Sequence, residues 1–208
     1  MAKALGHTNS RTRRGTRAGT ALQAKHAATT DCFFGDITYW GPKVEYYFFD
    51  KGAGRKPDLL VVVESHLRVS ELDRALCTIH RYGYTTAASP AAESDVSLDG
   101  THGGAIAAAP KRIHTTPLWD DTPIKFGWQS NHHQTVAIQI ALQGCDVIVI
   151  GSYLRGGLDE DIFGEISAIT TNGSISFIWY SDWNASPQKV WETGRPSQLK
   201  ATLITPTN

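Results

Sequence analysis

The hydrophobic positions of the chain change their period several times after about residue 30. Residues 59–63, LLVVV, form an apolar run rich in β-branched side chains, which predicts a strand buried on both faces. Alternation of apolar residues predicts another strand over 135–142, and residues 147–150 follow closely, so we expect these two to form an antiparallel hairpin. Shorter apolar segments predict further strands over 32–39, 104–109 and 175–180.

Apolar residues at helical spacing predict three helices between these strands. The first follows Gly41 and Pro42, the second begins at Ser70 as its N-terminal cap, and the third carries acids 159–161 in its first turn. The residues expected to face the core are Val44, Tyr47 and Phe48 in the first helix, Leu72, Ala75, Leu76 and Ile79 in the second, and Leu158, Ile162, Ile166 and Ile169 in the third.

The order of these elements restricts the fold class. Strands and helices alternate, yet at least one pair of strands is a hairpin, which excludes a purely parallel doubly wound sheet. Residues 85–103 are rich in Ser, Ala, Asp and Gly and are expected to form a surface loop, whereas 110–133 have no clear pattern. The sequence therefore predicts a single mixed-sheet α/β or α+β sandwich over residues 31–208.

Charge is distributed unevenly along the chain. Of the 20 basic residues, six lie in residues 1–30, which hold no acid, so residues 31–208 carry 14 bases against 20 acids. The first 30 residues lack an apolar period and are expected to be a disordered basic tail. Such a tail suits a nucleic-acid-binding arm, an organelle transit peptide or a solvated leader without a task. The arginines of the arm would be Arg11, Arg13, Arg14 and Arg17.

The cysteines and the hydropathy favour an intracellular protein. Cys32, Cys77 and Cys145 are far apart and form no CxxC motif, so a disulfide framework is not expected. No apolar run reaches the length of a membrane span. We therefore expect a nuclear or cytoplasmic protein without a membrane partner, while its oligomeric state stays open.

Polar residues stand at the carboxyl ends of several predicted strands. Glu64 follows LLVVV, Tyr153 follows VIVIGS, Asp182 and Asn184 follow ISFIWYS, and Asp36 lies at the end of the first strand. Each has a simple structural explanation as a loop acid, a core-edge tyrosine or part of an Asx turn. Their coincidence at strand ends favours a site of hard oxygen ligands, suited to Mg²⁺ or Mn²⁺ rather than Zn²⁺.

The segments around these residues resemble motifs of the endonuclease/exonuclease/phosphatase superfamily. VVVESHL (61–67) resembles its Gln-Glu-Thr-His segment, and SDWNASP (181–187) resembles its Gly-Asp-Phe-Asn-x-x-Pro segment. GTHGGAIA (100–107), IGSYLRGG (150–157) and GDITYWGPKVEYYF (35–48) resemble its Gly-Gly strand entry, its tyrosine-bearing strand and its first strand and helix. The order fits from about residue 31 onward and is most similar to retroelement-type and AP-endonuclease-like domains.

This resemblance implies a four-layer α/β/β/α sandwich of two mixed sheets and a Mg²⁺-dependent hydrolysis of phosphodiester bonds. Glu64, with Asp36, would bind the metal, and Asp182 would orient or deprotonate the attacking water. Asn184 and Tyr153 would hold the phosphate. The implied partner is nucleic acid, DNA rather than RNA.

The sequence also departs from the family pattern. Asp36 replaces an Asn, Ser181 a Gly and Val63 a Gln. The family's last strands carry an Asp-His pair, but this sequence ends LITPTN and has no histidine after His133, so we expect those strands to be missing and activity to be impaired. His66, two residues after Glu64, would share its face on a continuing strand, or is a loop histidine without a task.

Two other functions therefore stay open beside the enzyme. The chain could be a non-catalytic remnant of the same fold. It could also be a nucleic-acid-binding fragment that uses the basic tail and the aromatic residues Trp128, Trp179 and Trp183, although those tryptophans suit core or rim packing better.

Overall fold

The computed structural model describes residues 30–49, 56–94, 100–118, 133–142, 145–155, 160–171 and 174–204. Contacts divide the chain into the units Met1–Thr30 and Asp31–Asn208, and every described helix and strand lies in the second unit. Several residues named above lie outside the described ranges: Arg11, Arg13, Arg14, Arg17, Trp128, Leu158 and Asp159.

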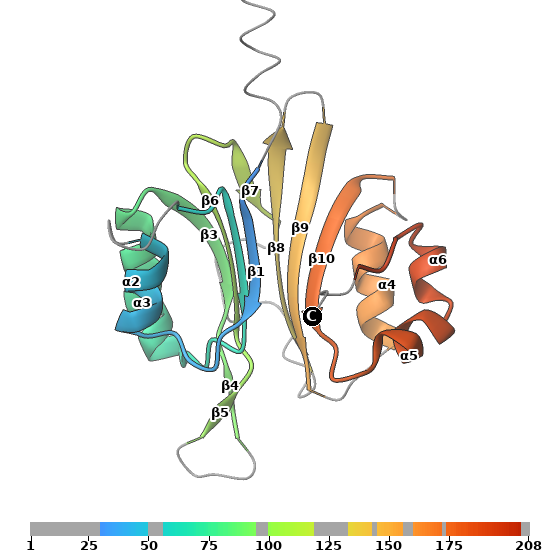
Figure 1. Ribbon diagram of the computed structural model, residues 1–208, viewed down its shortest axis with the longest axis horizontal. Coiled ribbons are helices and arrows are strands. Elements are labelled where there is room, and N and C mark those ends of the chain that lie inside the picture. Colours follow the sequence, from blue (N-terminus) through green and yellow to red (C-terminus); the bar gives the residue numbers. More distant parts are fainter. Residues whose placement is uncertain are drawn as a thin grey trace, which may run out of the picture. The chain divides into compact units, whose positions relative to one another are not determined.

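Four strands form the first sheet, in the order β1-β2-β6-β3. β1 is parallel to β2, whereas β6 is antiparallel to both of its neighbours. Helices α2 (Pro42–Phe49) and α3 (Val69–Arg81) cover one face of this sheet (Figure 1). The strand bounds are Cys32–Asp36 for β1, Leu59–Val63 for β2, Ala105–Pro110 for β6 and Tyr84–Ser89 for β3.

The second sheet has a matching arrangement, in the order β10-β9-β8-β7. β10 is parallel to β9, and β8 is antiparallel to β9 and β7. Helices α4 (Glu160–Ile169), α5 (Pro187–Glu192) and α6 (Arg195–Gln198) lie on its outer side (Figure 1). The strands are β7 (Thr115–Pro117), β8 (His133–Leu142), β9 (Cys145–Leu154) and β10 (Ser176–Asp182), while β4 (Ala92–Glu93) and β5 (Thr101–His102) form a separate ladder.

The two sheets pack face to face because alternate residues of their strands are apolar on the inner side. Val61 and Val63 of β2 and Val136 and Ile138 of β8 belong to one buried cluster between the sheets. Gly151 of β9 permits this close approach, since a Cβ there would lie 2.6 Å from the Cγ1 of Val61. The result is the predicted α/β/β/α sandwich of two mixed sheets.

Most predicted elements are confirmed, including the fully buried β2 and the β8–β9 hairpin. The surface loop expected over 85–103 is wrong, because Tyr84–Ser89 pairs with β6 as an edge strand of the first sheet. Backbone pairing with a central strand decided this segment, and its small polar residues did not signal it. In α2 the buried residues are Phe48 and Phe49, while Tyr47 is 60% exposed, contrary to expectation.

Other boundaries also differ from the sequence-based expectation. The first strand ends at Asp36 rather than residue 39, and β10 extends through Asp182. Helix α3 starts at Val69, with the backbone N–H of Arg68 donating to the Glu71 carboxylate at 3.1 Å, so Ser70 is not its cap. All three cysteines are free and exposed. Among the described helices, none has the length and apolarity needed to cross a membrane.

Candidate active site

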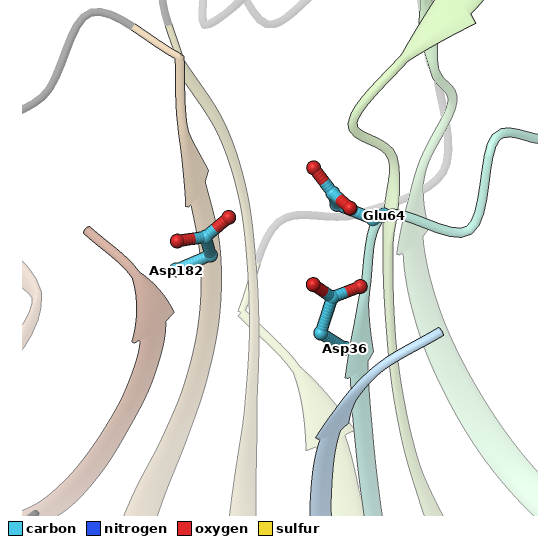
Figure 2. A group of neighbouring side chains, drawn as sticks. All are labelled: Asp36, Glu64 and Asp182. Carbon is cyan, nitrogen blue, oxygen red and sulfur yellow. The ribbon is translucent and has the colours of Figure 1, made fainter. Parts of the chain in front are cut away.

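Three carboxylates from both sheets meet at one end of the sandwich. One oxygen each from Asp36, Glu64 and Asp182 lies within 4.8 Å of the other two. Asp36 ends β1, Glu64 follows β2, and Asp182 ends β10, so the chain brings together residues that are far apart in sequence. Figure 2 shows the Asp182 carboxylate facing Asp36 and Glu64 across the space between the sheets. The sequence-based grouping of these acids is therefore realised in the fold.

Strand alternation explains why the two aspartates face each other. Asp36 lies two residues after Phe34, and Asp182 lies two residues after Tyr180, so each acid shares a face with an inner aromatic residue. The Phe34 and Tyr180 rings are stacked with centroids 5.8 Å apart and pack against the cluster between the sheets. The acids thus continue the inner faces just beyond the apolar core, where water can reach them.

Glu64 reaches the site through an unusual backbone conformation. β2 ends at Val63, and Glu64 and His66 both have a φ of 55°, in the left-handed region that non-glycine residues rarely adopt. The loop is held by backbone bonds from Ser65 N–H to the Gly104 carbonyl at 3.2 Å and from His66 N–H to the Gly103 carbonyl at 2.9 Å. His66 therefore lies in a loop and not on a continuing strand, which leaves the second of the two interpretations of this histidine.

Tyr153 and Gln134 extend the site across the second sheet. Asp182 pairs in register with Tyr153, and Tyr153 pairs with Gln134, so the three residues form one row. Gln134 is only 4% exposed. Its Oε1 accepts from the backbone N–H of Gly104, and its Nε2 donates to the His102 carbonyl at 3.4 Å. Gln134 thereby links the second sheet to the turn that holds the Glu64 loop.

Sequence reasoning missed Gln134, although a signal was present. It stands two residues before Val136, so its side chain points to the same inner face of β8. A polar residue at the start of an otherwise apolar face is the signal. The adjacent Gly103 has a φ of 72°, and a Cβ there would lie 2.6 Å from Cδ1 of Tyr153 and also against Gln134. Only glycine fits between these two side chains.

Mutual repulsion and burial shift the ionisation of the cluster. Burial, the neighbouring Asp36 charge and the charge of Asp182 raise the pKa of Glu64 to about 7, and the hydrogen bond from Tyr153 acts in the opposite direction. The pKa of Asp36 is also raised, chiefly by burial, while its hydrogen bond with Glu64 lowers it. Burial and then the Glu64 and Asp182 charges raise the pKa of Tyr153, which keeps its hydroxyl protonated. The pKa values of both Asp36 and Glu64 are thus raised by burial at the site.

The turn after β10 has partners of its own. The backbone N–H of Asn184 donates to Asp182 Oδ1 at 3.2 Å, which is an Asx-type turn, and its side-chain amide donates to the Leu154 carbonyl at 3.0 Å. Between them, Trp183 packs against Trp179, with ring centroids 4.4 Å apart, and against Phe163. The tryptophans therefore anchor this turn to the outer layer, as core packing predicts. Asn184 itself is exposed, and the Asx-type turn with Asp182 is what holds it near the acids.

The donor set fits a divalent cation of the Mg²⁺ type. Three carboxylates within 4.8 Å supply only hard oxygen ligands. Burial and then the neighbouring negative charges raise the pKa of Glu64 to about 7, and a bound cation would favour its carboxylate form. No cysteine belongs to this group, and no described histidine does either.

No family model and no curated protein matches the sequence. Solved structures do resemble the fold. The endonuclease domain of TRAS1, a telomere-specific non-LTR retrotransposon, has a TM-score of 0.52 at 14% identity over 82% of this chain and 71% of its own. The AP endonuclease LMAP from Leishmania major has a TM-score of 0.51 at 12% identity over 76% of this chain and 56% of its own.

The catalytic domain of human Nocturnin has a TM-score of 0.46 at 16% identity, and the match covers 68% of this chain. This chain spans 57% of the Nocturnin chain and 56% of LMAP. At these identities the likeness to TRAS1 and LMAP concerns the fold alone. The chain therefore has the fold of the endonuclease/exonuclease/phosphatase superfamily.

Proposed function

We propose that this chain hydrolyses phosphodiester bonds of nucleic acid, DNA in preference to RNA, with Mg²⁺ or Mn²⁺ as its cation. The observation that carries this proposal is the meeting of Asp36, Glu64 and Asp182 from two different sheets within 4.8 Å. A fold that only needed stability would gain nothing from three repelling carboxylates at one point. Such a cluster is useful where a bound cation neutralises the negative charge of the carboxylates.

The comparisons support the same reaction class. The structures with TM-scores above 0.5 are an endonuclease domain of a retrotransposon and an AP endonuclease, and both names denote DNA-directed enzymes. In this chain the acids lie where the parallel strand pairs β1–β2 and β9–β10 end, an edge at which α/β sheets commonly bind ligands. An intracellular location would suit this substrate.

In this proposal Glu64 and Asp36 hold the cation, because they lie side by side on the first sheet. The bound cation would supply positive charge that neutralises the carboxylates and polarises the phosphate. Hydrolysis then needs a nucleophile on the opposite side, and Asp182 faces that space from the second sheet. Its carboxylate orients a water molecule and accepts its proton as the water oxygen attacks phosphorus.

Two further residues hold the phosphate. The Tyr153 hydroxyl stays protonated because its pKa is raised, so it can donate to a phosphate oxygen as negative charge accumulates there. Asn184 would hold the phosphate or the water from the turn after β10. The bond from phosphorus to the leaving ester oxygen breaks, and that oxygen takes up a proton from solvent.

Plasmid cleavage tests the proposal. We expect the purified chain to nick supercoiled plasmid with Mg²⁺ and not with EDTA, and Glu64→Gln to abolish nicking. Glu192→Gln on the surface of α5 is the matched control and should nick normally, since its carboxylate bonds only Gln188 among the described residues.

Each other outcome has a definite meaning. Nicking that persists in Glu64→Gln after EDTA treatment would contradict a cation-dependent site. A folded chain without nicking activity would favour the remnant. Salt-sensitive DNA binding that survives Glu64→Gln but disappears when residues 1–30 are deleted would favour the binding fragment.

A further inference from the structure

An open groove lies next to the acidic cluster on the side of the first sheet. It has a volume of about 440 Å³ and is lined by Thr38, Tyr39, His66, Arg68, Glu71 and Thr101. Thr38 stands two residues after Asp36, and His66 stands two residues after Glu64, so the two segments that carry the acids of the first sheet continue into the lining of the groove. A polymeric substrate held at the acids would therefore have its neighbouring unit in this groove.

Tyr39 offers a flat aromatic surface at the groove. Its side chain is 54% exposed. Its ring lies against Gly41, where a Cβ would come within 2.9 Å of Cε1. The glycine thus leaves room for the ring to lie over the backbone, and the ring keeps a solvent-accessible surface. Aromatic surfaces of this kind stack on nucleobases without regard to sequence.

The remaining wall supplies polar groups suited to a nucleotide. Arg68 is exposed and can donate to a phosphate oxygen. His66 Nδ1 lies 2.9 Å from the Thr101 carbonyl, which can only accept, so Nδ1 carries the hydrogen. This bond fixes the imidazole ring in the groove wall, and among the described residues the contacts of the ring are made through Nδ1. Glu71 accepts from the backbone N–H of Arg68 and keeps that arginine at the start of α3.

The charge of the whole unit makes such local contacts necessary. Residues 31–208 carry 14 basic and 20 acidic residues, so the fold as a whole repels a polyanion. Stacking on an aromatic ring does not depend on net charge, and a single arginine acts on one phosphate. A groove with one ring and one guanidinium matches one nucleotide.

We propose that this groove binds one unpaired nucleotide next to the phosphate that is cleaved, with its base stacked on Tyr39 and its phosphate contacted by Arg68. The inference rests on the proposed hydrolysis, because the acids define the neighbouring phosphate. It narrows the substrate class to nucleic acid that is single-stranded or opened at the cleavage position. The protein thus binds a base as well as a phosphate, and a phosphodiester without a base would lack the contact with Tyr39.

Equilibrium binding tests the groove independently of catalysis. The full chain is titrated into a fluorescein-labelled single-stranded DNA oligonucleotide in Ca²⁺, and anisotropy is followed. We expect Tyr39→Ala to weaken binding about 5- to 100-fold, the range given by the loss of one stacked base. Tyr39→Phe should bind like the parent chain, because the ring is kept. Tyr46→Ala is the matched control, since Tyr46 is 56% exposed on α2 and does not line the groove.

Two more variants keep the test decisive. Gly41→Ala should weaken binding by pushing the ring aside, although every aromatic residue is still present. Arg68→Gln should reduce the slope of log affinity against log salt by about 0.7, whereas the exposed Arg74→Gln should leave it unchanged. Equal affinities of Tyr39→Ala and Tyr46→Ala would overturn the proposal.

The failure of the proposed hydrolysis would be visible separately. Bis(p-nitrophenyl) phosphate carries no base, so its Mg²⁺-dependent hydrolysis by the parent chain and by Glu64→Gln reports on the acids alone. Loss of binding in Tyr39→Ala without any hydrolysis of this compound would support the groove and reject the reaction. Hydrolysis of the compound with unchanged binding in Tyr39→Ala would support the reaction and reject the groove.

Discussion

The two sheets have the same arrangement of strands but contribute to the site in different ways. Each has a parallel pair followed by two antiparallel strands. In the first sheet every residue of β2 and β6 is buried, and Glu64 arises only after the strand, in a left-handed conformation. In the second sheet Gln134, Tyr153 and Asp182 lie within regular strands in one cross-strand row.

This difference shows how a sheet whose central strands are wholly apolar can serve a polar site. The central strands β2 and β6 have no inner position free for a charge, so Glu64 stands on the loop after β2, where its left-handed conformation costs about 1–3 kcal/mol. The second sheet contains two ten-residue strands, β8 and β9, which carry Gln134 near the start of β8 and Tyr153 near the end of β9, while β10 ends in Asp182. The first sheet therefore provides Asp36 at the end of β1 and Glu64 on a strained loop, and the second sheet provides a cross-strand row within regular strands.

Substitution of Gln134 should have the largest effect, because this side chain joins the cross-strand row of the second sheet to the turn that holds the Glu64 loop. We expect Gln134→Ala to lower kcat for plasmid cleavage about 10- to 100-fold by letting that turn shift. It should also reduce the free energy of unfolding by about 1–3 kcal/mol, since the Gly104 N–H loses its partner.

Gln139→Ala is the matched control for this change. Gln139 lies in the same strand but bonds Asp146 at an exposed position, so kcat should stay unchanged. A parallel loss of kcat in both variants would mean that Gln134 acts only through the stability of β8.

The pH dependence of cation binding sharpens the comparison, because burial and its neighbours raise the pKa of Glu64 to about 7. A cation needs the carboxylate, so affinity for Mg²⁺ should fall up to about tenfold per pH unit below that pKa and level off above it. Calorimetric titration at several pH values measures this. Asp182→Asn removes one of the charges that raise the pKa of Glu64 and should shift the dependence to lower pH.

The stability of the cation-free protein should show the opposite trend. Between the ordinary pKa of 4.5 and about 7 the folded chain holds a proton on Glu64 that the unfolded chain has released. The free energy of unfolding therefore decreases as pH rises through this window. Glu64→Gln should remove this decrease in thermal unfolding with EDTA, and a decrease that persists would assign it to another group.

The last prediction concerns the distance between the two sheets and an effect on stability alone. Gly151→Ala places a Cβ against Val61, so we expect it to reduce the free energy of unfolding by about 1–3 kcal/mol in urea titrations. Gly164→Ala on α4 meets no atom within 4 Å and should instead stabilise by about 0.5–1 kcal/mol. If Gly151→Ala is as stable as the parent chain, the sheets separate easily and their spacing does not position the acids.

The sequence by itself determined the elements with strong local patterns. The apolar run of β2, the alternation of β8 and the helical stripe of α3 each follow from side chains that must leave water on one or both faces. Strand-end polarity also identified Asp36, Glu64, Tyr153 and Asp182 as one group, because parallel strands end at the same edge of a sheet. For these features local spacing was sufficient.

Only the tertiary structure decided the features that depend on a partner far away in the chain. The strand Tyr84–Ser89 exists because β6 completes its hydrogen bonds, and Gln134 acquires its function from Gly104 thirty residues earlier. The left-handed conformation of Glu64, its raised pKa and the groove beside Tyr39 arise from packing between segments. Burial and long-range pairing change the free energy of a residue without leaving a mark on its sequence neighbours. Local patterns therefore did not reveal these features, and for Gln134 they showed only a polar residue on an inner face and not its partner.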